Sequence, residues 1–226
     1  MLLSGQCLIS SYVDISSGLG ASYCLDAATG QLRWHTPALP FNHRAIAGYE
    51  KFLLTAYGYG ASLTQLRDGH GQILREWERT GLACVRPSGE IVIAEEFSPT
   101  PSVWELYSDG SVRQGAGVSG TYSTPPVLTQ DGSFIFWRAG SLCEIDSQLQ
   151  LHVLHSAPQL SDWAGGSTML LCPDGTFVFG IYDTQGRCDE LWFVASAYAL
   201  EDKSSWPCAD GNMAANPCWP LEFGAA

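Results

Sequence analysis

A pair of neighbouring carboxylates is the first feature of this sequence that could support chemistry. Glu95 and Glu96 stand side by side, and paired carboxylates perform general acid–base catalysis in glycosidases. Adjacent residues on a strand point to opposite faces of its sheet, so these two carboxyl groups cannot flank one glycosidic bond. The pair therefore predicts solvated loop charge, and glycosidase activity is a disfavoured alternative.

Three Asp-Gly dipeptides raise the question of calcium binding. Their aspartates are Asp109, Asp131 and Asp174, and none continues into the D-x-[DN]-x-[DN]-G pattern of a calcium loop. Asp-Gly is also the typical sequence of a tight hairpin turn, because glycine readily adopts a positive φ. We expect these aspartates to hold turns.

The histidines and cysteines show no metal-binding or redox spacing. None of the five histidines has a partner at metal-ligand spacing, no cysteine pair has CxxC spacing, and there is no Gly-x-Ser-x-Gly elbow. We therefore predict no catalytic residue, no cofactor and no metal ion. Eight cysteines favour an extracytoplasmic or secreted location over the cytosol, although the first residues of this chain do not read as a signal peptide. Four thiols fall in strand-like runs, where we expect them to pack as small hydrophobes: Cys24, Cys84, Cys143 and Cys172.

An internal repeat of about 40 to 43 residues positions these side chains. Three segments with turn glycines at 89, 132 and 175 align without gaps, and each reads as strand, polar turn, strand. A second hairpin in each unit has its turn at 30, 71, 110 or 149. Two hairpins per period make four short strands, and no segment has apolar residues at helical spacing. This pattern is typical of β-propeller blades.

The sequence thus predicts an all-β fold, a β-propeller of about five four-stranded blades over residues 1–199. The irregular tail over 200–226 is a candidate ring-closing segment. Residues 1–35 show three strand-like runs, so we expect the first blade to lack its inner strand. Another copy of the chain could complete that open edge, which makes a homo-oligomer a candidate assembly.

One copy of the repeat resembles the quinoprotein-like (PQQ-type repeat) β-propeller family. From Asp26 the sequence reads Asp-Ala-Ala-Thr-Gly-Gln-Leu-Arg-Trp, and the family consensus is Ala-x-Asp-x-x-Thr-Gly, three residues, then Trp. Cys24 stands where the family has Ala. The resemblance implies that Asp26, Thr29 and Gly30 form an outer turn, and that Trp34 packs between neighbouring blades.

The resemblance does not extend to the cofactor of that family. Its quinone-dependent dehydrogenases generally have eight blades, two adjacent cysteines in a vicinal disulfide, and a calcium ion held by acidic and Asn side chains. This sequence predicts about five blades, has no Cys-Cys pair and scatters its acidic residues. We expect binding of neither pyrroloquinoline quinone nor calcium, and dehydrogenase activity is a disfavoured alternative.

Composition restricts the partners. With 11 Lys and Arg against 23 Asp and Glu, the net charge is −12, which repels nucleic acid and anionic membrane surfaces. The apolar runs are also too short to insert into a membrane. We therefore expect a protein or carbohydrate partner.

Aromatic side chains gather in the loops that a propeller would bring to one rim. Such rings suit the recognition of proteins or sugars, although they could equally pack against their own loops. The residues that we predict to bind are Phe41, His43, Tyr59, Tyr122 and Trp163, and the loops within blades add Tyr57, Phe97 and Tyr182. The predicted function is a non-enzymatic acidic scaffold that binds a protein or peptide over one face. The alternative is a carbohydrate-binding lectin-type propeller, which the differing loop sequences disfavour.

Overall fold

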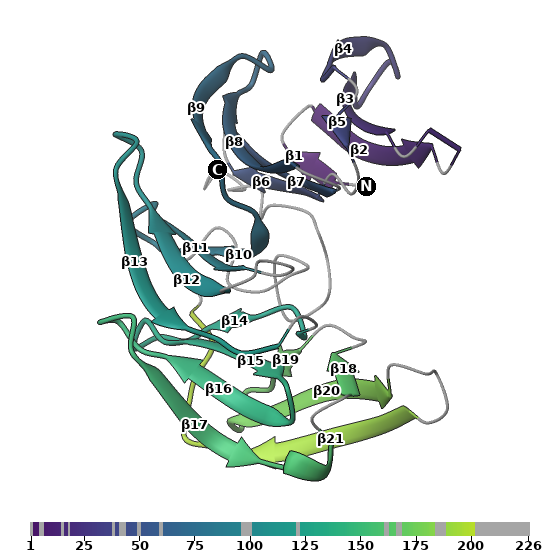
Figure 1. Ribbon diagram of the computed structural model, residues 1–226. Coiled ribbons are helices and arrows are strands. Elements are labelled where there is room, and N and C mark those ends of the chain that lie inside the picture. The colour runs from purple at the N-terminus through teal and green to yellow at the C-terminus, as the bar shows by residue number, and fades with distance from the viewer. Residues whose placement is uncertain are drawn as a thin grey trace, which may run out of the picture. The chain divides into compact units, whose positions relative to one another are not determined.

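A computed structural model shows antiparallel β-structure along most of the chain (Figure 1). The residues that it describes fall into two compact units, one within Met1–Thr80 and one within Gly81–Ala215. No helix in this described part is long and apolar enough to cross a membrane. The described residues are 2–4, 7–14, 16–17, 19–37, 39–40, 44–48, 51–58, 61–95, 101–120, 123–160, 163–165, 169–183 and 189–201.

Two sheets form the first unit, and each places its strands in sequence order. The first sheet contains β1 (Leu2–Ser4), β2 (Cys7–Asp14), β3 (Leu19–Asp26) and β4 (Leu32–His35), with β5 (Leu39–Pro40) paired to the start of β3. The second sheet contains β6 (Arg44–Gly48), β7 (Lys51–Gly58), β8 (Ala61–Asp68) and β9 (Ile73–Trp77).

The first sheet has four rows where the sequence shows three strand-like runs. Strand β1 supplies the inner row, with Leu2 opposite Ile9 and Ser4 opposite Cys7. Three residues are too few to show an alternating pattern, so only the pairing with β2 reveals this strand. The expected open edge is therefore filled, and it gives no basis for a homo-oligomer.

Three sheets form the second unit. The third contains β10 (Gly81–Val85), β11 (Ile91–Glu95), β12 (Ser102–Leu106) and β13 (Val112–Gly117). The fourth contains β14 (Val127–Leu128), β15 (Phe134–Arg138), β16 (Ser141–Ile145) and β17 (Leu151–Ser156), followed by the 3-10 turn η1 (Pro158–Leu160). The fifth contains β18 (Trp163–Gly165), β19 (Leu170–Leu171), β20 (Thr176–Asp183) and β21 (Asp189–Ala195).

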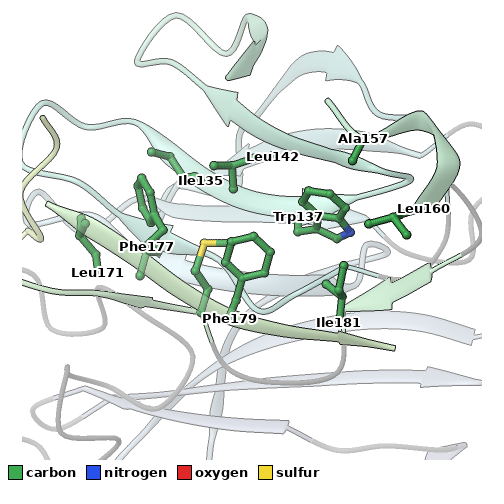
Figure 2. Close-up of a cluster of buried hydrophobic side chains, with 11 residues drawn as sticks. Ile135, Trp137, Leu142, Ala157, Leu160, Leu171, Phe177, Phe179 and Ile181 are labelled. Carbon is green, nitrogen blue, oxygen red and sulfur yellow. The ribbon is translucent and has the colours of Figure 1, made fainter. Parts of the chain in front are cut away.

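The fourth sheet is packed on both faces. Phe134 and Phe136 of β15 belong to the hydrophobic cluster shared with the third sheet. Ile135 and Trp137, which alternate with them, belong to the cluster shared with the fifth sheet. Figure 2 shows this second cluster, in which Trp137 lies beside side chains of β20. Because successive strand residues point to opposite faces, one apolar strand stabilises two interfaces.

Among the described residues, the fifth sheet has three rows, whereas each of the other sheets has four. Strands β18 and β19 both pair with one side of β20, and β21 pairs with the other side. The described residues that follow β21, 196–201, do not add a fourth row beside it. Ser196 donates its backbone N–H to Gly175, and Leu200 bridges to Thr129 at the end of β14.

Asp26 organises the turn between β3 and β4. Its Oδ1 accepts hydrogen bonds from the N–H groups of Ala28 (3.0 Å) and Thr29 (2.9 Å) and from the Thr29 hydroxyl (3.0 Å). Arg33 forms an ion pair with Oδ2. The hydrogen bonds from Arg33 and Thr29 lower the pKa of Asp26 to about 2. Gly30 follows with a φ of +70°.

Trp34 joins the first sheet to the second. Its indole Nε1 donates to the carbonyl of Gly69 at 3.3 Å, in the turn between β8 and β9. A Cβ atom on Gly71 would lie 2.6 Å from Cδ2 of the same indole. The ring therefore rests directly on the backbone of the neighbouring turn, where only glycine fits.

A comparison of the equivalent turn glycines Gly30 and Gly71 measures how much the packing of Trp34 against Gly71 contributes to stability. Both have positive φ, +70° and +81°, but a Cβ on Gly30 would meet nothing within 4 Å. We expect Gly30→Ala to cost about 1 kcal/mol through its backbone conformation alone. Gly71→Ala should cost a further 1–3 kcal/mol, approximately, because it forces Trp34 away. Urea unfolding of both variants measures the difference, and equal losses would contradict the packing role of Trp34.

Candidate functional site

Most of the aromatic residues predicted to bind lie outside the described residues. This holds for Phe41, His43, Tyr59 and Tyr122, so their role stays a prediction. Trp163 begins β18, and its side chain is also outside the described part of the structure.

Tyr182 is the predicted loop aromatic whose side chain the structure describes, whereas Tyr57 is placed by its backbone alone, in β7 opposite Ser62. It lies near the end of β20 and pairs with Ala164, next to the pair of Trp163 with Asp183. This end of the fifth sheet lies opposite the turn at residues 172–175 that joins β19 to β20. The Tyr182 side chain is 36% exposed. An accessible aromatic ring thus stands on the strand beside Trp163, at the end of the sheet from which the β20–β21 loop departs.

Buried charges lie at the corresponding ends of the third and fourth sheets. Arg138, the last residue of β15, is 1% exposed; it donates to the Ser123 hydroxyl at 3.3 Å and lies 5.3 Å from the centre of the Phe136 ring. Glu95, the last residue of β11, accepts the backbone N–H of Ser102 at 3.1 Å. The expectation of solvated charge is therefore wrong for Glu95, because its carboxylate turns inward to hold the start of β12. Glu96 is outside the described residues.

The largest described cluster of ionisable groups lies between the third and fourth sheets. Arg86 forms an ion pair with Glu105 (Nε to Oε1, 2.9 Å), with side chains 12% and 6% exposed. Arg86 also donates from Nη1 to the carbonyl of Gly132 at 2.9 Å, in the next sheet. Tyr107 donates its hydroxyl proton to Glu105, and this hydrogen bond is the main cause of the raised pKa of Tyr107. The group links two sheets and presents no free nucleophile.

A second set of contacts joins the same two sheets farther out. Arg113 donates to the carbonyl of Gln148 at 2.8 Å, and the N–H of Ala116 donates to the carbonyl of Leu149 at 2.9 Å. Arg113 also reaches Glu105 at 3.4 Å. Sequence reasoning missed these residues because their contacts are between sheets and no local pattern marks them. The repeat could have indicated these contacts, because Gln148 and Leu149 occupy a predicted turn that would lie beside the preceding sheet.

The thiols and histidines of the described residues serve packing and turns. Cys24, Cys84 and Cys143 are buried, as their strand positions predict, whereas Cys172 lies in the turn after β19 and is only half-buried. Burial raises the pKa of Cys143 to about 11, so the thiol stays protonated at neutral pH. His152 pairs with Asp146 at 2.9 Å on the surface. Within the described ranges, no group of three or more His, Cys, Asp or Glu residues could hold a metal ion.

Comparison with known proteins identifies the fold. No protein-family model and no curated protein shows a significant sequence match. The β-propeller domain of the Trilobed protease from Pyrococcus furiosus is similar, with a TM-score of 0.52 and 12% identity over 87% of this chain and 65% of that chain. The Dos1 propeller is similar at a TM-score of 0.52 and 11% identity, over 85% of this chain and 58% of that chain.

The chain therefore spans less than two thirds of the length of both propellers. Identities this low show likeness in fold alone. Together with the four-stranded antiparallel sheets, they confirm the predicted all-β, β-propeller fold. The number of blades and the PQQ-type repeat stay predictions.

The ion pair of Arg86 with Glu105 should contribute to stability through burial. Glu105→Ala leaves the Arg86 guanidinium buried without its carboxylate, which we expect to cost about 3–5 kcal/mol in free energy of unfolding. Asp109→Ala, in the exposed neighbouring turn, is the control and should cost about 1 kcal/mol or less. Urea denaturation monitored by tryptophan fluorescence measures both. A loss at Glu105 no larger than at Asp109 would show that the ion pair does not stabilise the protein.

Proposed function

We propose that this chain is a non-enzymatic β-propeller scaffold that binds a protein or peptide partner at the loop ends of its sheets. The observation that carries the proposal is the exposed ring of Tyr182, which stands on the strand next to Trp163. Large, rigid aromatic side chains are frequent anchors in protein interfaces because they bury much area at low entropic cost. The binding role of Phe41, His43, Tyr59 and Tyr122 rests on the sequence and remains part of the proposal.

The roles of the described polar residues support a scaffold. Asp26 holds a turn, Glu95 holds the start of a strand, and Arg86, paired with Glu105, joins the third sheet to the fourth through the Gly132 carbonyl. An acid–base catalyst needs a titratable group directed at a substrate, and these groups are directed at the protein itself. A net charge of −12 favours a partner that surrounds its apolar contact with Lys or Arg.

A carbohydrate-binding function is the second candidate, since aromatic rings also stack on sugars. A lectin with one site per blade repeats its binding residues, however. Seven residues after the turn glycine, the fourth repeat has Ala139 and the third has Glu96, whereas β7 of the second sheet has Tyr57 at the matching strand position. The aromatic at this position is therefore absent from two of the sheets, which favours a protein contact over a site in every blade.

We also assign the repeat to the quinoprotein-like type, on the run from Asp26 to Trp34. The turn hydrogen bonds of Asp26 and the contact of Trp34 with the next sheet support this assignment. The proposal concerns architecture and implies no quinone cofactor.

Substitution at the loop end tests the function. A partner is isolated from native extract on the immobilised full chain, identified, purified and titrated by calorimetry against Tyr182→Ala, Trp163→Ala and the control Leu154→Ala. We expect the first two to weaken binding by at least about tenfold and the control, on the surface of β17, to have no effect. Unchanged binding by both aromatic variants would refute the loop-end site. Binding to immobilised glycans that Tyr182→Ala abolishes would favour the lectin alternative.

A further inference from the structure

Strand β21 is the outermost described strand of its sheet although it is only the third row. In the other four sheets the third strand is covered by a fourth, namely β4, β9, β13 or β17. Strand β21 is the third row of its sheet and pairs with β20 alone among the described residues (Figure 1). Its backbone N–H and C=O groups on the side away from β20 therefore form a strand edge.

The four fourth-row strands carry features that oppose pairing with another chain. Each of them pairs with a register shift, between Cys24 and Leu25, Leu66 and Arg67, Ser102 and Trp104, or Leu142 and Cys143. Such bulges, together with charged side chains, protect sheet edges from association. Strands β4, β9 and β13 also contain arginines.

Strand β21 has no bulge, and its charged residues are confined to its first two positions, Asp189 and Glu190. It pairs with β20 in one regular register from Asp189 to Ala195, without a shift. From Leu191 to Ala195 it contains no charged residue. Leu191 and Phe193 are 64% and 67% exposed, more than any other large hydrophobic side chain in the described ranges. A regular, apolar and exposed edge is the kind of strand that recruits another strand.

The two faces of β21 have different surroundings. Trp192 and Val194 pack against the hydrophobic cluster shared by the fourth and fifth sheets. Leu191 and Phe193 alternate with them and point to the opposite face, opposite Gly180 and Val178 of β20. An added strand would therefore need apolar residues at the positions beside Leu191 and Phe193.

The sequence of β21 meets this requirement when it pairs with itself. We propose that β21 of two copies of this chain pair antiparallel about a two-fold axis at Trp192. In this register Leu191 of each copy lies opposite Phe193 of the second copy, and all seven residues of the strand are paired. The acidic Asp189 and Glu190 lie opposite Ala195 and Val194 of the second copy. No carboxylate faces another, and the two exposed apolar side chains cover each other.

Other registers and occupants fit less well. A shift of the partner by one residue turns its exposed side chains to the other face of the sheet. A two-fold axis at Leu191 or Phe193 pairs fewer residues of the strand. Residues 202–226 of the same chain contain Pro207, Pro217 and Pro220 and no long run of strand-forming residues, so their sequence is a poor fourth row. The net charge of −12 on each copy opposes association, so salt should strengthen the dimer.

Light scattering of the full chain during size-exclusion chromatography tests the dimer. We expect a mass moving from 24.4 kDa towards twice that value as concentration and salt rise. Phe193→Lys should keep the molecule monomeric at every concentration, with unchanged circular dichroism. The matched control is Val153→Lys, since Val153 is 57% exposed on the bulged strand β17; it should still dimerise. These outcomes do not depend on the loop-end function.

A cross-link tests the register. In Leu191→Cys combined with Phe193→Cys, thiols of the two copies face each other, and mild oxidation should give a covalent dimer. Either substitution alone should cross-link far less, because identical residues on the two strands are then diagonal rather than opposite. Wild-type protein controls for the native cysteines.

Three results would overturn the proposal. The first is a monomer at all concentrations. The second is a monomer whose melting temperature falls by several degrees in Leu191→Ser, which would show that another part of the same chain covers this face. The third is a mass that grows without limit, which would indicate open assembly rather than a two-fold pair.

Discussion

The packing of one sheet against the next, with alternate residues of a strand serving two interfaces, is the constraint on which this structure depends. In β15, Phe134 and Phe136 face the third sheet, whereas Ile135 and Trp137 face the fifth. A sheet built this way has two apolar faces and cannot be stable alone. The fourth sheet therefore needs a neighbour on both sides, and the third and fifth sheets provide them.

Charged groups near these interfaces are held by contacts with the protein itself. Arg86 forms an ion pair with Glu105 and donates to the Gly132 carbonyl of the next sheet, and Arg138 stands over Phe136 and donates to the Ser123 hydroxyl. Removing one partner of such a group leaves a desolvated charge, which costs more than the pair contributes. These residues are therefore committed to the fold.

Strand edges show how the chain limits unwanted association. The fourth-row strands are shifted in register and several carry arginine, so their edges are poor templates for another strand. Strand β21 has a regular edge that is uncharged from Leu191 to Ala195, and the chain beyond Ala195 pairs near Leu128 rather than beside β21. The edge of β21 differs from those of the fourth-row strands because of the path that the chain takes after Ala195. A local sequence pattern does not predict that path.

The sequence alone determined the period, the hairpin turns and the all-β fold, because turn chemistry and two-residue alternation are local properties. Local patterns also predicted burial of Cys24, Cys84 and Cys143. Pairing decided the rest: β1 became a strand through its contact with β2, and Glu95 turned inward to Ser102. The three-row fifth sheet likewise followed from pairing of distant segments. Such contacts join residues whose separation leaves no local pattern, so only the tertiary structure could decide them.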